Sequence, residues 1–186
     1  MLNILGVGGH AKVVIDAALA SGKEIEAIFD DDETTHGANF CGYDVSGNIA
    51  ANLQGNAIIA IGSNNVRKNI SDRLKKINWR SVIHPTAIIA NDVEIGEGSV
   101  IMAGAIIQSG TKIGKHCIIN TGACIDHDCG IDDYVHIAPN CGIAGGVEIG
   151  EGSFIGIGSS VSQYLKIGEW SQIGAGAAVV SELPAN

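Results

Sequence analysis

Residues 113–149 read IGKHCIINTGACIDHDCGIDDYVHIAPNCGIAGGVEI, and every sixth residue of this stretch is isoleucine. The same period runs from residue 83 to residue 179, always with Ile or Val at the sixth position. The series comprises Ile83, Ile89, Ile95, Ile101, Ile107, Ile113, Ile119, Ile125, Ile131, Ile137, Ile143, Ile149, Ile155, Val161, Ile167, Ile173 and Val179. Neither an α-helix nor an alternating β-strand produces a period of six.

Small residues follow the same period, four positions after the branched residues, and glycine often follows the branched residue directly. The pattern is therefore [LIV]-G-x-x-[small]-x. A short strand that buries one branched side chain and then turns a corner needs six residues, so three such sides make an 18-residue coil. Coils of this kind stack about 4.8 Å apart through backbone hydrogen bonds. Residues 82–186 are thus predicted to form a parallel β-helix of roughly five coils.

The first part of the chain, residues 1–81, has a different pattern, which predicts a small α/β domain with a parallel sheet. Apolar runs predict strands at residues 2–7, 25–29 and 57–61. Helices are predicted at residues 8–20 and 64–77, and a long loop at residues 30–55.

The first predicted strand runs into Gly6-Val7-Gly8-Gly9-His10-Ala11, which matches G-x-G-x-x-A. Glycines there let the backbone approach a phosphate, and the following helix supplies amide donors at its N-terminus. The motif predicts a Rossmann-like nucleotide-binding domain. A dinucleotide dehydrogenase is an alternative, but 81 residues are too few for a full doubly wound domain, and a tight turn without a ligand is a second alternative.

Composition excludes several classes of function. A net charge of −9 with no basic cluster argues against nucleic acid as a partner. The N-terminus lacks the pattern of a signal peptide and no segment has membrane-spanning length, so we expect a cytoplasmic protein with reduced thiols. Three cysteines, Cys117, Cys129 and Cys141, stand twelve residues apart in the small-residue series. We expect them to be core residues and predict no metal site.

The ordered set of motifs resembles the PglD/NeuD family of bacterial sugar acetyltransferases across nearly the whole chain. The set consists of the Gly8-Gly9-His10 loop, a strand ending in three aspartates, the segment IAIGSNN at residues 59–65, and the hexapeptide repeats. The resemblance implies a left-handed β-helix, a homotrimer, acetyl-CoA held between neighbouring β-helices, and a nucleotide-linked sugar on the N-terminal domain.

The most specific segment is NTGACIDHDC at residues 120–129, followed by His136. The resemblance implies that His127 is the general base, with Asp128 as its carboxylate partner and Asn120 as a polar catalytic residue; Asp126 is an alternative partner. It also implies two sets of binding residues. The sugar nucleotide is expected at Gly8, Gly9, His10, Asp31, Asp32, Ser63 and Asn64, and acetyl-CoA at His136, Ala144, Gly145 and Ala175.

Spacing supports this assignment independently, because residues 18 apart stack on adjacent coils and place His127 beneath Gly145. A free amide at Gly145 would hold the acetyl oxygen. His136 lies half a coil from His127, so a site that uses both draws them from different subunits. Covalent catalysis by Cys124 or Cys129 is an alternative. His84 and His116 are expected on the surface or at the start of a coil.

The predicted activity is acetyl transfer from acetyl-CoA to the 4-amino group of a nucleotide-linked 4-amino-4,6-dideoxy sugar, with UDP favoured. Alternatives are a GDP- or dTDP-linked amino sugar and O-acetylation of sialic acid. A γ-type carbonic anhydrase shares the β-helix but needs a three-histidine zinc site, whose spacing is absent here. A non-catalytic scaffold would survive loss of His127. Where the family usually continues in a basic tail, this sequence reads Leu183-Pro184-Ala185-Asn186, so we expect weaker contacts to the CoA phosphates.

Overall fold

The computed structural model describes residues 1–186 and begins with a four-stranded parallel sheet of order β2-β1-β5-β6. Its elements are β1 (Leu2–Leu5), α1 (Gly9–Ala20), β2 (Ile25–Phe29), a 3-10 helix (Glu33–Thr35), β3 (Asn39–Phe40), β4 (Tyr43–Asp44), β5 (Gly55–Ile59), α2 (Asn64–Arg73) and β6 (Ile77–Trp79). Gly6 ends β1 with φ 122°, and a Cβ there would meet Ile61, so only glycine fits this turn. Neither helix has the length and apolar composition needed to cross a membrane.

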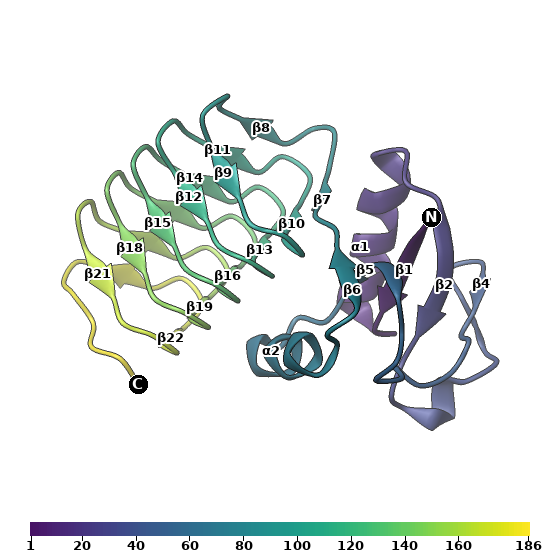
Figure 1. The fold of residues 1–186 in the computed structure, drawn as a ribbon. Coiled ribbons are helices and arrows are strands. Elements are labelled where there is room, and N and C mark those ends of the chain that lie inside the picture. The colour runs from purple at the N-terminus through teal and green to yellow at the C-terminus, as the bar shows by residue number, and fades with distance from the viewer.

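The rest of the chain is a parallel β-solenoid with three faces, stacked beside the N-terminal sheet (Figure 1). The docked face consists of β7 (Val82–Ile83), β10 (Val100–Ile101), β13 (Ile118–Ile119), β16 (His136–Ile137), β19 (Phe154–Ile155) and β22 (Gln172–Ile173). The uncharged face consists of β8 (Ile88–Ile89), β11 (Ile106–Ile107), β14 (Cys124–Ile125), β17 (Gly142–Ile143), β20 (Ser160–Val161) and β23 (Ala178–Val179). The charged face consists of β9 (Glu94–Ile95), β12 (Lys112–Ile113), β15 (Gly130–Ile131), β18 (Glu148–Ile149) and β21 (Lys166–Ile167).

The coil period is 18 residues, as the repeat predicts. Val100 pairs with Ile118 and Ile118 with His136, and every other strand pair of the solenoid has the same offset. Apart from Ile83, which is 38% exposed at the end of the stack, the second residue of each strand points inward, so the six-residue series fills one continuous core. This core depends on the β-branched residues at the predicted positions.

Where the small residue near a corner is Ser, Thr or Cys, it has a second role, because its side chain donates a hydrogen bond to a carbonyl, usually the one 15 residues later. Ser99 Oγ lies 2.8 Å from the Gly114 oxygen, and Cys141 Sγ lies 3.0 Å from the Gly156 oxygen. Cys117 makes the same contact with Asp132 at 3.0 Å. The evenly spaced cysteines are therefore core thiols, as the sequence predicts.

The corners of the solenoid use the left-handed backbone conformation every sixth residue, usually with glycine. Six corners carry a side chain instead, namely His116, Asp128, Tyr134, Asn140, Tyr164 and Trp170. A residue with a Cβ pays roughly 1–2 kcal/mol for this conformation, although Asn and Asp tolerate it better. Five of the six side chains lie against the glycine 18 positions earlier, where any Cβ would collide with them.

Arg67 of α2 attaches the N-terminal part to the docked face and is only 1% exposed. Its guanidinium donates to the oxygens of His116 (3.0 Å), Tyr134 (2.8 Å), Ile61 (3.2 Å) and Gly62 (2.9 Å). No carboxylate pairs with it, so four backbone carbonyls from both parts of the chain stabilise the buried charge.

His116 is buried at 3% exposure, and the expectation that it lies on the surface is wrong. Its ring stacks on Tyr134 with centroids 5.4 Å apart and meets the edge of Trp79 at 4.8 Å. The sequence pattern of a single solenoid does not reveal that a second part of the chain covers this corner. Burial, followed by the charge of Arg67, lowers the pKa of His116 to about 4.

The second helix is shorter than predicted, since α2 ends at Arg73 rather than at residue 77. Leu74 already has extended dihedral angles, and Ile77 pairs with Gly55 in the sheet. Strand pairing therefore overrides the helical pattern of the last residues.

Replacing Arg67 by methionine should lower the free energy of unfolding by about 3 kcal/mol, because several buried carbonyls lose a charged donor. Chemical denaturation measures the loss. Lys75→Met on an exposed position beside the same helix is the control and should change stability by less than about 0.5 kcal/mol. Equal stabilities of the two variants would contradict the role of Arg67.

Candidate active site

His127 and Asp128 form a pair at the corner between the uncharged and charged faces. His127 Nδ1 lies 2.8 Å from Asp128 Oδ2, which favours the tautomer that keeps Nε2 free of a proton. Asp126 instead accepts the backbone N–H of His127 at 2.8 Å. The geometry thus gives the ring contact to Asp128 and a backbone contact to Asp126.

This environment makes His127 a stronger base. The hydrogen bond to Asp128, followed by the charge of Asp126, raises the pKa of His127 above its ordinary value of 6.5. The imidazole is half exposed, so it is accessible to an incoming reactant. A neutral imidazole with a free Nε2 and a carboxylate on Nδ1 is suited to general-base catalysis.

The next coil covers the histidine as the 18-residue period predicts. A Cβ built on Gly145 would lie 2.7 Å from His127 Nε2, and the N–H of Gly146 donates to the His127 oxygen at 2.9 Å. The N–H of Gly145 donates to no protein acceptor. An unused amide beside an imidazole is the arrangement that stabilises a developing oxyanion. The neighbouring Ala144 lies on the same corner.

The cysteines near this corner do not form a nucleophile–base pair with His127. Cys129 is 2% exposed, and its thiol donates to the Ala144 oxygen at 3.3 Å. Burial raises the pKa of this thiol, so it stays protonated at neutral pH. Cys124 lies exposed on the uncharged face and makes no hydrogen bond to His127.

Asn120 and His136 form a second polar cluster, on the edge between the docked and uncharged faces. Asn120 Oδ1 accepts the Thr121 N–H at 2.8 Å, so its Nδ2 donates to His136 Nε2 at 3.1 Å. His136 Nδ1 lies 3.3 Å from the Gly62 oxygen of the N-terminal part. Burial, then the charges of Arg67 and His10, lowers the pKa of His136 to about 3, so it is neutral.

The predicted catalytic and cofactor residues therefore fall on two different corners of one chain. His127, Asp128, Ala144 and Gly145 share one corner, whereas Asn120, His136 and Ala175 line a 520 Å³ pocket at the other. The sequence groups these residues by motif, but their positions around the triangle separate them.

The glycine loop of the N-terminal part is open to an anion. Helix α1 begins at Gly9 after Gly8, which provides no side-chain cap, and its first turn contains no acidic residue. The N–H of Val7 donates to Asp30 Oδ2 at 2.5 Å and holds the loop in place. The N–H groups of Gly8, Gly9 and His10 donate to no protein acceptor. These free amides and the helix dipole favour a phosphate. Nearby His10 has a buried Nε2 without a partner, and burial lowers its pKa to about 4.

The aspartates after β2 have separate roles. Asp31 lines a 370 Å³ pocket, where it accepts the Ile49 N–H at 2.9 Å and pairs with Arg73 at 2.7 Å. Asp32 instead caps the 3-10 helix through Thr34 and lies outside this pocket. Sequence reasoning missed Asn69 and Arg73, which line the pocket from α2 and carry no motif of their own.

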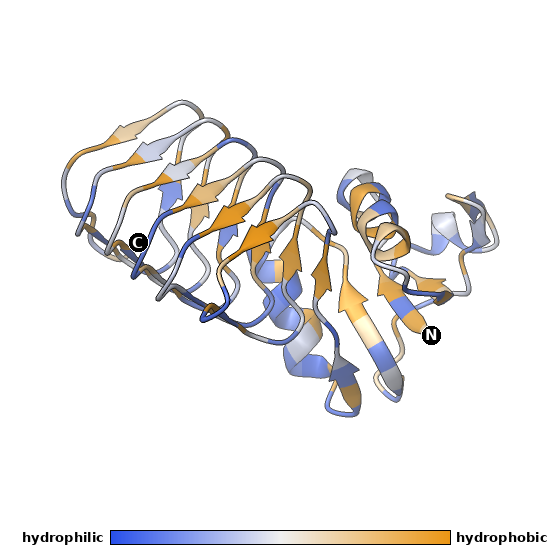
Figure 2. Cartoon of the chain, turned by 90° about the horizontal axis from the view of Figure 1, so that it is seen from above, coloured by the Kyte–Doolittle hydropathy of each residue, from blue (hydrophilic) through white to orange (hydrophobic).

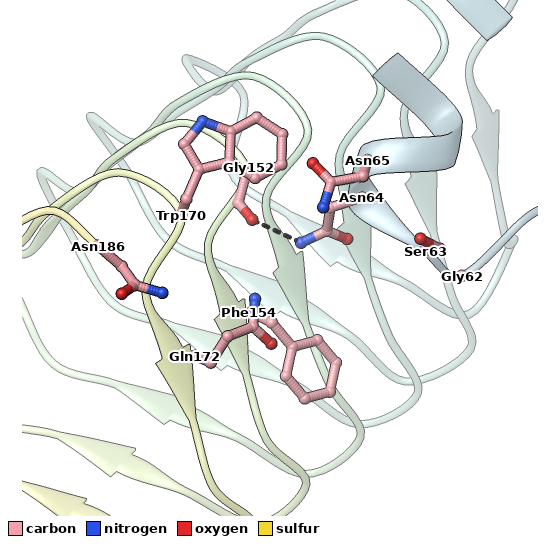
Figure 3. Close-up of a pocket in the computed structure, with 9 residues that line it drawn as sticks. All are labelled: Gly62, Ser63, Asn64, Asn65, Gly152, Phe154, Trp170, Gln172 and Asn186. Atoms are coloured by element: carbon pink, nitrogen blue, oxygen red, sulfur yellow. Dashed lines mark hydrogen bonds between the residues drawn. The ribbon is translucent and has the colours of Figure 1, made fainter. Parts of the chain in front are cut away.

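Ser63 and Asn64 line a 630 Å³ pocket between the start of α2 and the docked face (Figure 3). Asn64 Nδ2 donates to the oxygens of Gly152 (2.8 Å) and Ser153 (3.1 Å). Its first role is therefore to join the two parts of the chain. The remaining lining residues are Gly62, Asn65, Gly152, Phe154, Trp170, Gln172 and Asn186.

A solenoid of six-residue repeats with a histidine–carboxylate pair beside a free amide defines a hexapeptide-repeat transferase. Residues 92–127 match the family described as bacterial transferase hexapeptide (six repeats), and residues 1–74 match the PglD N-terminal domain. The chain belongs to the PglD-like family of sugar N-acetyltransferases, and its solenoid is of the left-handed type.

Solved structures of similar proteins support this placement. A histidine mutant of perosamine N-acetyltransferase from Caulobacter crescentus, in complex with CoA and GDP-perosamine, is 37% identical, with a TM-score of 0.91 over 100% of this chain and 90% of that chain. The acetyltransferase domain of PglB from Neisseria gonorrhoeae FA1090, in complex with acetyl coenzyme A, is 35% identical, with a TM-score of 0.89 over 98% of this chain and 92% of that chain.

Curated relatives match over shorter regions. The UDP-N-acetylbacillosamine N-acetyltransferase of Bacillus subtilis (strain 168) is 42% identical over 108 residues, which are 54% of this chain and 50% of that protein. An uncharacterized protein L142 of Acanthamoeba polyphaga mimivirus is 36% identical over 101 residues, or 20% of its length. These matches thus span half or less of the curated relatives.

A methyl group on Gly145 should displace the His127 ring without unfolding the chain, because the residue has ordinary backbone angles and the ring is half exposed. Gly145→Ala should retain its melting temperature and lose about a hundredfold in the rate of acetyl transfer. Gly130→Ala on the charged face, where a Cβ has room, is the control and should retain both. A Gly145→Ala variant with the wild-type rate of acetyl transfer would contradict the close approach of the His127 ring to Gly145.

Proposed function

We propose that this chain is an acetyl-CoA-dependent N-acetyltransferase for the 4-amino group of a nucleotide-linked 4-amino-4,6-dideoxy sugar. The observation that carries the proposal is the His127–Asp128 pair lying against the free amide of Gly145. The same proposal divides the chain into a Rossmann-like sugar-nucleotide domain at residues 1–81 and a β-helix domain at residues 82–186.

Direct transfer needs only the groups at this corner. The sugar amine attacks the thioester carbonyl, a C–N bond forms, and the oxygen accepts a hydrogen bond from the Gly145 N–H. His127 Nε2 takes the proton from the amine and returns it to the sulfur as the C–S bond breaks, which releases CoA as a thiol. Asp128 stabilises the imidazolium that forms between these steps.

The uncharged face supports a homotrimer. Its outward residues carry no charge, and Ile88 is 64% exposed in a single chain. Figure 2 shows this row of strands from above: the isoleucine pairs are orange, which marks hydrophobic residues, and the strands toward the C-terminal end are paler. The other two faces are covered by the N-terminal part or carry ion pairs such as Glu148–Lys166 at 2.8 Å. Such an apolar strip favours burial against further copies.

A trimer built on this face would also complete the site. Asn120 borders one edge of the uncharged face and His127 borders the other, so a three-fold axis brings the first edge of one copy to the second edge of its neighbour. Acetyl-CoA would then lie between the Gly145 corner of one chain and the pocket of Asn120, His136 and Ala175 in the next.

The pocket of Asp31 and Asn69 is proposed to hold the nucleobase, and its polar groups favour uracil. A carboxylate that binds guanine accepts from its N1–H and N2–H groups, and the Asp31 carboxylate is less available for this role because it already accepts from the Ile49 N–H and pairs with Arg73. The exposed amide of Asn69 offers one donor and one acceptor, which matches O4 and N3–H of uracil.

The direct test incubates the protein with acetyl-CoA and a panel of UDP-, GDP- and dTDP-linked 4-amino sugars and sialic acid while thiol release is followed. We expect turnover with the UDP-linked 4-amino sugar and a loss of about 100- to 10,000-fold in His127→Ala. Equal rates in both proteins would remove His127 from the mechanism. Preference for the GDP-linked sugar would contradict the nucleobase argument alone.

The pH dependence of kcat/KM tests the pairing of His127 with Asp128. The reaction needs neutral His127, and Asp128 raises the pKa of this group, so removing the carboxylate lowers it. The acidic limb of kcat/KM in Asp128→Asn should therefore move to lower pH while the plateau rate falls. Asp126→Asn is the matched control, with a smaller shift because its carboxylate does not bond to the ring. An unchanged limb in Asp128→Asn would contradict the pairing.

A further inference from the structure

Two aromatic residues at solenoid corners have no role in packing one part of the chain on the other. Tyr164 has φ 58° and Trp170 has φ 57°, although neither side chain favours this conformation. The rings lie against Gly146 and Gly152 respectively, each one coil earlier. A strained, incompletely buried aromatic residue that persists at a corner usually made by glycine points to a contact outside the chain.

Tyr164 stands next to the free amide. Its own N–H donates to the Gly145 oxygen at 3.0 Å, and its ring covers Gly146. Since the imidazole of His127 approaches Gly145 from the previous coil, an acetyl group at this amide has the base on one side and Tyr164 on the other. The amine arrives on the side of the base, so the rest of the bound donor extends toward Tyr164, a residue that is 71% exposed.

Trp170 lines the pocket at the start of α2 and faces Asn64 and Phe154 across it (Figure 3). No lining side chain is charged, and the polar side-chain groups are a hydroxyl and carboxamides from Ser63, Asn65 and Gln172 among others. An indole face with uncharged donors and acceptors suits a neutral sugar ring, whereas phosphate or a carboxylate sugar would need a cation. Phe154 and Gln172 also line the pocket of His136, so the two cavities adjoin.

We propose that each of these two rings contacts one substrate. Tyr164 packs against the pantetheine arm of the acetyl donor, and Trp170 packs against the neutral sugar ring of the acceptor. This inference rests on the proposed function, and it assigns two specificity-determining residues that do not take part in proton transfer.

The test compares Tyr164→Gly with Trp170→Gly, a matched pair because each change removes one ring and relieves the same backbone strain. Tyr164→Gly should raise the KM for acetyl-CoA, and for S-acetylpantetheine, by about fivefold to tenfold, with the KM for the UDP-linked 4-amino sugar unchanged. Trp170→Gly should show the reverse pattern. Neither glycine variant should have a lower melting temperature than the wild-type protein. Tyr164→Phe, which keeps the ring, should have the wild-type KM for acetyl-CoA.

Calorimetric titration with CoA separates the two levels of the proposal. A wild-type protein that does not bind CoA would overturn the proposed function and this inference together. Wild-type binding that Tyr164→Gly leaves unchanged would overturn the inference alone, as would an effect on acetyl-CoA without an effect on S-acetylpantetheine. Loss of the oligomer in Tyr164→Gly, measured by light scattering, would make the ring a subunit contact and would also overturn it.

Discussion

Parallel pairing of each solenoid strand with the strand 18 residues later, through backbone hydrogen bonds such as that from the Val100 N–H to the Cys117 oxygen, is the constraint on which the rest of the structure depends. It fixes which side chains face inward, so one Ile or Val in six fills the core. It also aligns corners into columns, so that a side chain on one coil lies on the backbone of a neighbouring coil. The candidate site follows those columns, because the contact between His127 and Gly145 is set by the period and not by a loop.

The same constraint explains why glycine is required next to functional side chains. A corner residue with a side chain needs bare backbone on the neighbouring coil, as Asp128 has at Gly110 and Tyr164 has at Gly146. Docking of the N-terminal part uses the exception to this rule, where the rings of His116 and Tyr134 stack in one column beside Arg67. One set of corners therefore holds the two parts together, and others carry the candidate site.

The solenoid and the contact between His127 and Gly145 could be predicted from sequence because a fixed period converts residue numbers into positions, and 127 and 145 differ by 18. Contacts between the two parts of the chain could not be predicted, because no period relates them. The burial of His116 and the four carbonyls around Arg67 follow from that docking. The end of α2 at Arg73 follows instead from the pairing of Ile77 with Gly55 in the N-terminal sheet. The role of Asp32 as a cap was missed because adjacent aspartates look equivalent in a sequence.

We propose that one site is assembled from two chains, with the base from one copy and the Asn120–His136 cluster from the next. Subunit mixing tests it most directly: His127→Ala and His136→Ala proteins, each inactive alone, are unfolded together, refolded and assayed for acetyl transfer. Mixed trimers contain some interfaces with both native histidines, so the account predicts that part of the wild-type activity returns. A mixture that forms trimers but stays as inactive as its components would contradict it.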